Sequence, residues 1–178
     1  DGRDRRFDVT LLINGLPIAQ IELKQVTTKD GIYQAFNQVK KYAEEGVFRN
    51  NIFSTLQLFV VSNEQTTRYF ANALPKNMHR KLLFSWRTKN NQKVENLYEF
   101  CKQVLNIPDA HRLIADYTIV SEDQDNKILM VLHPYQIHAI EALYVSANKH
   151  ESGYVWHATG SGKTLTSFVS TKLLARKS

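Results

Sequence analysis

The stretch FDVTLLINGLPIAQIELK, residues 7–24, decides the fold of the first part of this chain. Residues 7–13 and 18–24 each alternate apolar and polar side chains, as strands with one buried face do. Asn14-Gly15 and Pro17 stand between them, and an Asn-Gly pair between alternating segments is a strong hairpin signal. We therefore predict two antiparallel strands joined by a tight turn.

The predicted hairpin has one apolar and one polar face. Cross-strand partners share a side of a sheet, so the polar residues of both strands should lie together. A bare two-residue turn would set Asp8 opposite the apolar Ile21 instead. We therefore expect a loop of three or five residues, or a β-bulge, which brings Asp8 opposite Glu22. The shared polar face then carries Asp8, Thr10, Gln20, Glu22 and Lys24.

Two carboxylates directly opposed repel each other, and a hard divalent cation is the usual compensation. Mg²⁺ suits a site formed by Asp8, Glu22 and the backbone carbonyl of Leu23. Such an ion polarises a phosphate oxygen and lowers the pKa of a bound water. Lys24, on the same face, would orient that water or stabilise developing negative charge. An ordinary surface strand with an i, i+2 ion pair is the competing interpretation.

Residues 29–45 predict a helix, because apolar side chains recur there at helical spacing. Gln38 and Tyr42 form a Gln-x-x-x-Tyr pattern, which sets both side chains on one helical face, one turn apart. We expect them to act beside the hairpin. The alternative is a solvated polar stripe.

The middle of the chain predicts further elements without a recognisable motif. The apolar run 56–62 indicates a central strand buried on both faces, and helix, strand and helix follow at 66–73, 82–86 and 96–105. Residues 76–93 hold six cations and no acid, either a solvated edge or a surface that tracks phosphates. The polar, acidic residues 121–126 indicate a linker between domains 1–125 and 126–178.

A second motif, GYVWHATGSGKTLTSF, covers residues 153–168. It predicts a strand at 153–157, a glycine-rich loop and a helix from Lys163, which is the context of a phosphate-binding loop. Backbone N–H groups of Gly160, Ser161 and Gly162 would surround the phosphates of ATP at the helix N-terminus. Lys163 would reach the β- and γ-phosphates, and Thr164 would ligate Mg²⁺. A helix at 134–147 precedes this motif, with Gln136 in its first turn.

The 178 residues are 43% hydrophobic and carry a formal net charge of +6, which is compatible with a nucleic-acid partner. Cys101 is the only cysteine, so no disulfide can form within the chain, and we expect a reducing, cytoplasmic location. The chain opens with a charged run rather than a signal peptide. No apolar run is long enough to span a bilayer, so no membrane partner is expected.

Several of these motifs resemble known ones. Asp8, Glu22 and Lys24 on a hairpin resemble the PD-(D/E)xK nuclease core, with Phe7 where that core has proline. Gln38 and Tyr42 resemble a motif that contacts DNA near the scissile phosphate in some of these nucleases. Gln136, within HPYQ, resembles the adenine-sensing glutamine of superfamily-two helicases. With these motifs taken together, the chain resembles the restriction subunit of type I restriction-modification enzymes, which combines a motor and a nuclease.

The resemblance implies an α/β fold: a PD-(D/E)xK core with a mixed sheet flanked by helices at 1–125, then the start of a RecA-like superfamily-two helicase domain at 126–178. It implies Mg²⁺ and ATP as cofactors, and ATP-dependent translocation and cleavage of double-stranded DNA. The implied partners are double-stranded DNA and the modification (methyltransferase) and specificity subunits. We expect the chain to be an N-terminal fragment that binds ATP without turning it over.

Two other classes of protein fit the same residues. The first is a superfamily-two helicase or translocase whose N-terminal domain binds DNA or protein without cutting; Mg²⁺-dependent cleavage separates it from the nuclease. The second is a non-enzymatic interaction module, which predicts that Asp8 and Glu22 lie far apart. A stand-alone repair nuclease is disfavoured by the fused phosphate loop.

Overall fold

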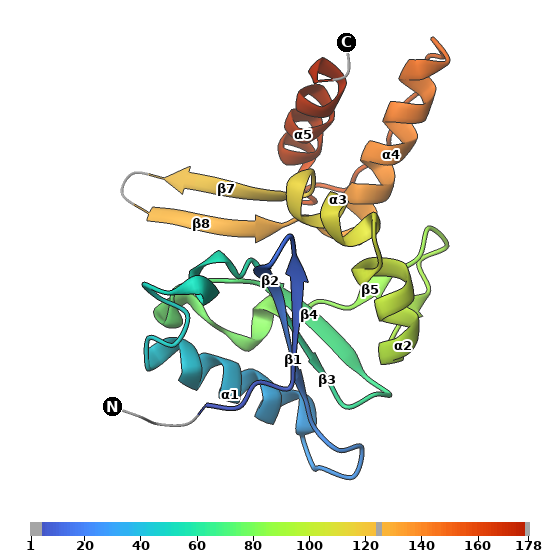
Figure 1. Ribbon diagram of the computed structural model, residues 1–178. Helices are drawn as coiled ribbons and strands as arrows, with labels where there is room; N and C mark the ends of the chain where they lie inside the picture. Colours follow the sequence, from blue (N-terminus) through green and yellow to red (C-terminus); the bar gives the residue numbers. More distant parts are fainter. Residues whose placement is uncertain (1–4, 124–125, 177–178) are drawn as a thin grey trace.

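A mixed four-stranded sheet forms the centre of the first part of the chain (Figure 1). The structure is a computed structural model that describes residues 5–123 and 126–176. The strands lie in the order β1-β2-β3-β4; β2 and β3 are parallel and the outer pairs are antiparallel. Their bounds are β1 (Val9–Ile13), β2 (Leu16–Leu23), β3 (Leu58–Ser62) and β4 (Thr67–Ala71). The expected α/β class is confirmed.

The hairpin β1–β2 combines a tight turn with a bulge. Asn14 and Gly15 both have positive φ, 52° and 80°, as a two-residue type I′ turn requires. The pairing then shifts between Leu11 and Leu12, and Ile18 is the extra residue on β2. Beyond the bulge Val9 pairs with Ile21, and the same register extended by one residue would set Asp8 opposite Glu22. The expected bulge is confirmed.

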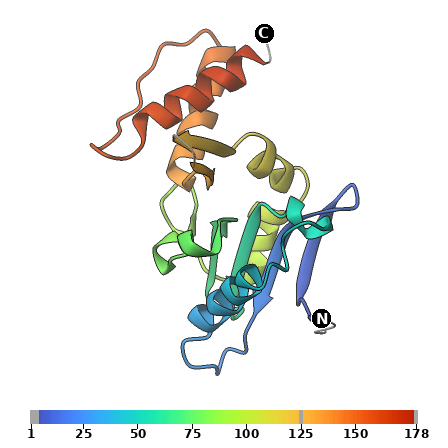
Figure 2. The same cartoon turned by 90° about the vertical axis from the view of Figure 1, so that its left-hand side faces the viewer.

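The central sheet is covered on both faces. Helix α1 (Gly31–Glu44), predicted at 29–45, packs Phe36 and Val39 against Phe59 and Phe70 of β3 and β4. The opposite face packs against a second cluster that includes Trp86, Phe100, Val104 and Leu113. All five residues of β3 are buried, as a central strand predicts. Figure 2 shows α1 lying along one side of the sheet.

Two predictions for the segment after β3 need correction. Residues 67–71 form the strand β4 rather than a helix, because Thr67, Tyr69 and Phe70 are buried in contact with β3 and the two cores. The strand predicted at 82–86 is mostly irregular: Phe84 forms an isolated bridge to Tyr69, and only Trp86 belongs to β5. Tertiary pairing overrides local propensity in both places. Short elements surround them: η1 (Ile52–Thr55), η2 (Pro75–Asn77), η3 (Arg80–Leu82), β5 (Trp86–Arg87) and β6 (Lys93–Val94).

The helix predicted at 96–105 is confirmed as two joined segments. It begins as α2 (Leu97–Phe100), where the Asn96 side chain accepts hydrogen bonds from the backbone of Tyr98 and Glu99, and it continues as the π-helical turn η4 (Cys101–Leu105). Helix α3 (Asp109–Ala115) follows.

The linker predicted at 121–126 is instead part of a two-stranded ribbon. Strands β7 (Thr118–Asp123) and β8 (Asn126–Val131) pair through apolar residues such as Val120 and Leu129, which outweigh the acidic composition of residues 121–126. Residues 124–125 of the predicted linker lie outside the described residues. The domain boundary expected between 125 and 126 falls within this ribbon and stays a prediction.

Helices α4 (Pro134–Asn148) and α5 (Lys163–Ala175) pack side by side beyond the ribbon (Figure 1). Both were predicted, but the strand expected at 153–157 is wrong. That segment is extended and exposed, with Trp156 91% accessible, and no described strand pairs with it. An extended segment without a neighbour has no sheet partner for its backbone groups. No described helix is long and apolar enough to cross a bilayer.

Candidate active site and phosphate loop

The two predicted carboxylates meet where β1 begins and β2 ends. Asp8 Oδ2 accepts a hydrogen bond of 2.8 Å from the backbone N–H of Leu23. The next N–H along β2, that of Lys24, bonds to Ser62 of β3 at 2.9 Å, so Leu23 faces the opposite side, toward β1. A residue's N–H and C=O point to the same side of a strand. The Leu23 carbonyl therefore lies on the side of Asp8.

Glu22 is buried on the polar face of β2, with 1% of its surface exposed. Its Oε1 lies 3.2 Å from Lys24 Nζ, whereas Oε2 has no hydrogen-bond partner among the described residues. Burial raises the pKa of Glu22 from 4.5 to about 7, and the nearby negative charge of Asp8 adds to this rise. A buried, unpaired carboxylate oxygen beside a second carboxylate is the arrangement that a cation would stabilise.

Helix α1 holds Lys24 in place through a chain of hydrogen bonds. Lys24 Nζ donates to Gln38 Oε1 at 2.6 Å, and Gln38 Nε2 donates to the Tyr42 hydroxyl at 2.7 Å. The Tyr42 hydroxyl in turn lies 3.5 Å from the carbonyl oxygen of Arg6, two residues before Asp8. Gln38 and Tyr42 stand one helical turn apart, as expected. The fold thus gathers all five predicted nuclease residues.

The donors at this site suit Mg²⁺. Mg²⁺ commonly binds one or two carboxylates and keeps several waters, and here Asp8, the free Oε2 of Glu22 and the Leu23 carbonyl are available. Within the described part of the chain, no group of three or more His, Cys, Asp or Glu gathers as a metal site. The set of two carboxylates and a carbonyl is the all-oxygen kind that hard cations such as Mg²⁺ prefer.

The second predicted site is a glycine-rich loop before α5. Gly160 and Gly162 have φ of 75° and 77°, and α5 begins at Lys163 directly after Gly162. Lys163 and Thr164 are exposed, and Lys163 Nζ lies 3.4 Å from the carbonyl oxygen of Ala158. The loop therefore leads into a helix N-terminus, as a phosphate site needs, whereas the Ser161 N–H donates to the Ala158 carbonyl oxygen at 3.3 Å.

Gln136 is buried and connects the start of α4 to this loop. Its Oε1 accepts from the backbone N–H of His133 at 2.9 Å, and its Nε2 lies 3.4 and 3.5 Å from the carbonyl oxygens of Ser161 and Gly162. Both ends of the amide thus have partners within the protein. The adenine contact expected of Gln136 stays a prediction, because it requires the amide to leave at least one of these partners.

Two further residues contact the loop, and the contacts they make were not predicted from the sequence. The Tyr135 hydroxyl donates to the Ser161 carbonyl at 3.0 Å, and His157 Nδ1 lies 3.0 Å from Ser161 Oγ. The position of Tyr135 directly before Gln136 was the available signal. A largely apolar cavity of about 490 Å³ lies beside the loop, between β8, Phe84 and Tyr135.

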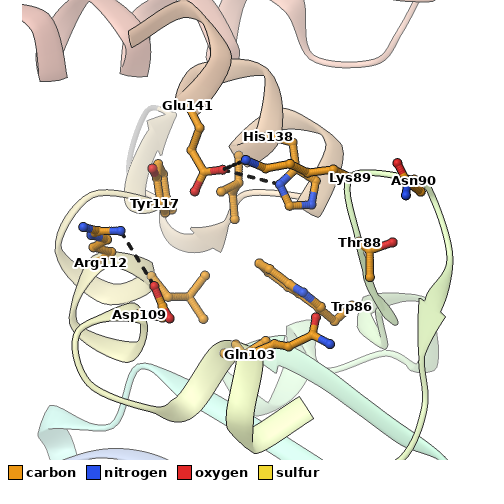
Figure 3. Close-up of a pocket in the computed structure, with 13 residues that line it drawn as sticks. Trp86, Thr88, Lys89, Asn90, Gln103, Asp109, Arg112, Tyr117, His138 and Glu141 are labelled. Atoms are coloured by element: carbon orange, nitrogen blue, oxygen red, sulfur yellow. Dashed lines mark ion pairs between the residues drawn. The ribbon is translucent and has the colours of Figure 1, made fainter. Parts of the chain in front are cut away.

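Another cavity, of about 550 Å³, lies between the β5–β6 hairpin, α3 and α4 (Figure 3). His138 Nε2 lies 2.9 Å from the carbonyl oxygen of Arg87. The Glu141 carboxylate lies 3.4 Å from Lys89 Nζ and 3.6 Å from His138 Nδ1. The neighbouring carboxylate raises the pKa of His138, and the neighbouring ring lowers that of Glu141. This cluster joins α4 to the hairpin, and no sequence pattern links residues so far apart.

The basic segment 76–93 is not a single free row of cations. Arg80 stacks over the ring of Tyr33, with 4.5 Å between the guanidinium carbon and the ring centre. Lys89 pairs with Glu141, and Lys93 lies 3.9 Å from Glu95. Two of its six cations therefore lie near an acid, and the segment keeps most of its positive charge.

Comparisons with known proteins decide the family. Residues 1–78 match the model of the type I restriction enzyme R protein N terminus, and residues 129–178 match that of the type III restriction enzyme, res subunit. A type I restriction enzyme endonuclease subunit from Staphylococcus aureus (strain COL) is 40% identical over 173 residues, 97% of this chain. The chain belongs to the type I restriction enzyme R protein family.

Other R proteins support the same placement. An endonuclease subunit from Staphylococcus saprophyticus is 42% identical over 97% of this chain and 18% of its own length. The type I restriction enzyme EcoprrI endonuclease subunit from Escherichia coli is 36% identical over 78% of this chain and 43% of its own length. The chain spans about a fifth of the length of the staphylococcal relatives, 18%. The acid site lies in the first matched range, and Gln136 and the loop lie in the second.

Proposed function

We propose that this chain carries the nuclease site of a type I restriction R protein, which hydrolyses phosphodiester bonds of double-stranded DNA with Mg²⁺. The single observation that carries the proposal is Glu22: buried, with one oxygen on Lys24 and the other unpaired, opposite Asp8. In this proposal the four-stranded sheet and its flanking helices form a PD-(D/E)xK core. Asp8, Glu22 and Lys24 are its catalytic residues.

Asp8, Glu22 and the Leu23 carbonyl would hold the metal. When bound, Mg²⁺ supplies a Lewis acid that polarises a phosphate oxygen and lowers the pKa of a coordinated water. Asp8 is already oriented for this task, because its Oδ2 is held by the N–H of Leu23. Its position counts against the interaction module, for which the two carboxylates should be far apart.

Lys24 provides the positive charge of the site. Its ammonium group is held between Glu22 Oε1 at 3.2 Å and Gln38 Oε1 at 2.6 Å, and 21% of its side chain is exposed. From this position it stabilises negative charge that develops on the attacked phosphate, or orients the attacking water. Gln38 and Tyr42 fix the ammonium and line the approach of the DNA backbone.

The second half of the proposal concerns ATP. Backbone N–H groups of Gly160, Ser161 and Gly162, at the N-terminus of α5, would bind phosphate oxygens. Lys163 would exchange its weak contact with the Ala158 carbonyl for the β- and γ-phosphates, and Thr164 would ligate Mg²⁺. Gln136 would contact the adenine. We infer that α4, the loop and α5 open a RecA-like superfamily-two helicase domain.

In the complete R protein, ATP hydrolysis at this domain would drive translocation of double-stranded DNA. The proposed partners are the modification (methyltransferase) and specificity subunits. The names of the relatives support this assignment, because each is called a type I restriction enzyme endonuclease subunit.

The test compares plasmid cleavage and ATP hydrolysis by the full-length R protein, assembled with those subunits. Three forms are needed: unchanged, Glu22→Ala and Lys163→Ala. Glu22→Ala should abolish cutting and keep ATP hydrolysis, whereas Lys163→Ala should lose ATP hydrolysis. If Glu22→Ala still cuts, the nuclease assignment is wrong, and the first domain is a non-catalytic binding module of a motor. If Lys163→Ala still hydrolyses ATP, the phosphate-loop assignment is wrong.

A further inference from the structure

We propose that Thr10 and Gln20 are positioning residues. Their hydrogen bond stabilises the pairing register of β1 on β2 and so holds Asp8 opposite Glu22. The inference rests on the proposed nuclease function and adds two residues to it. The Thr10 hydroxyl donates to Gln20 Oε1 at 2.6 Å across the two strands. Of the side-chain to side-chain hydrogen bonds between described residues, this is the one that joins β1 to β2.

The edge position of β1 gives an added constraint on its register a role. β1 has a single neighbour in the sheet, and Val9 on its apolar face is about half exposed, at 45%, although Leu11 on that face packs against the core. Burial of the apolar face therefore specifies the register only in part. A slip of one residue turns every side chain of a strand to the opposite face, and the bulge at Ile18 adds an alternative pairing. The Asn14-Gly15 turn and the bond from the Leu23 N–H to Asp8 already favour the observed register, and the Thr10–Gln20 bond adds to them.

Gln20 supplies that constraint because it is a buried polar side chain. Only 1% of its surface is exposed, and its backbone pairs with Phe59 in the apolar middle of the sheet. A buried amide is costly unless it is hydrogen-bonded. Its Nε2 lies 3.2 Å from the Ile21 carbonyl, and its Oε1 receives the Thr10 hydroxyl. In a slipped register Val9 or Leu11 would face Gln20, and Oε1 would lose that donor.

The Thr10–Gln20 hydrogen bond lies next to Asp8 and Glu22, on the same face of the hairpin. Thr10 lies two residues from Asp8, and Gln20 lies two residues from Glu22, so the two cross-strand pairs are neighbours on the polar side of the hairpin. Neither Thr10 nor Gln20 is among the metal donors assigned above. Loss of their bond should therefore weaken Mg²⁺ binding through Asp8 and leave the chemistry itself intact.

The test is a Mg²⁺ titration of DNA cleavage by the assembled full-length R protein. Thr10→Val keeps the shape of the side chain and removes the hydroxyl; Thr10→Ser keeps the hydroxyl. We expect Thr10→Val to raise the half-saturating Mg²⁺ concentration about tenfold, as loss of a residue that orients metal ligands does. Cutting should recover at high Mg²⁺, Thr10→Ser should behave as the unchanged protein, and ATP hydrolysis should be unchanged.

Gln20→Met is the second variant, and it should give the same shift. The double variant should shift no further than either single one, because the two residues act through one bond. Thr118→Val is the matched control, since its hydroxyl bonds to the Leu113 carbonyl at 2.8 Å, in a part of the chain away from the acids. It should leave the Mg²⁺ dependence unchanged.

Three results would overturn the inference. The first is an unchanged half-saturating Mg²⁺ concentration in either Thr10→Val or Gln20→Met. The second is an equal loss of cutting in Thr10→Ser and Thr10→Val, which indicates a purely structural role. The third is normal cutting by Glu22→Gln in the same assay, which would end the nuclease assignment as well. Inactive Glu22→Gln with normal Thr10→Val would end the inference alone.

Discussion

The acid site and the phosphate loop of this chain are held very differently. Glu22 lies on β2, which is paired with a strand on each side, and hydrogen bonds connect Lys24, Gln38 and Tyr42 around it. The loop instead lies between an exposed, unpaired segment and α5, and its Lys163 and Thr164 face solvent. The difference teaches that a motif can be complete in sequence while the structure around it is not. Pairing of β2 with a strand on each side completes the first site, whereas the second lacks a paired strand among the described residues.

Core substitutions give the largest expected difference between the two regions. Phe36 is 2% exposed between α1 and the sheet, so Phe36→Ala should lower the free energy of unfolding by about 3–5 kcal/mol. Phe168 in α5 is 60% exposed, and Phe168→Ala should change it by less than about 0.5 kcal/mol. Urea unfolding of the chain, followed by circular dichroism, measures both. Equal losses in the two variants would contradict the comparison.

The pH dependence of the free energy of unfolding should identify Glu22 as the group of the acid site whose ionisation destabilises the fold. Its pKa is raised from 4.5 to about 7, so the folded chain holds a proton that the unfolded chain has lost. Without metal, the free energy of unfolding should therefore fall between pH 4.5 and 7, by about 3 kcal/mol. Glu22→Gln should lack this fall. Urea unfolding across this pH range measures the difference.

Mg²⁺ provides the control for that experiment. Added at pH 8, it should stabilise the unchanged chain, because the cation neutralises the ionised pair, and it should have little effect on Glu22→Gln. A fall with pH that persists in Glu22→Gln would show that another group is responsible.

The smallest expected effect lies at the junction of the two regions. Glu141 raises the pKa of His138, so this pair contributes stability that is present at low pH and is lost as pH rises through the raised pKa. His138→Gln should therefore cost more stability near pH 6 than near pH 8, by less than about 1 kcal/mol. His150→Gln, at an exposed histidine just beyond α4, should show no such difference. Urea unfolding at the two pH values tests it, and a cost that does not vary with pH would refute the pairing.

The acid site could be predicted from the sequence because strand alternation constrains it. The need to bring Asp8 and Glu22 to one face predicted the bulge, and helical spacing placed Gln38 and Tyr42 together. The strand β4 could not be predicted, because its identity depends on pairing with β3 rather than on its own five residues. The ribbon β7–β8 was missed for a similar reason: residues 121–126 are acidic in composition, and the pairing of the apolar residues on either side of them is a property of the fold.

The contacts around the loop were harder to foresee because they connect distant segments. The amide of Gln136 was expected to be free for a ligand, yet it bonds to the backbone of His133 and lies against the loop. The link between His138 and Arg87 crosses 51 positions of sequence. Such contacts depend on how the helices pack against the sheet, and local sequence patterns do not predict them.

The close approach of Gln136 to Gly162 has a consequence for the substitutions that position 162 can accept. A Cβ at position 162 would lie 2.5 Å from Gln136 Nε2, and the φ of 77° there already disfavours other residues. A mutation that adds any side chain at 162 would displace the glutamine from the loop. Any residue placed at 162 must therefore adopt a left-handed φ and push the end of the Gln136 side chain aside, although 26 residues separate the two positions.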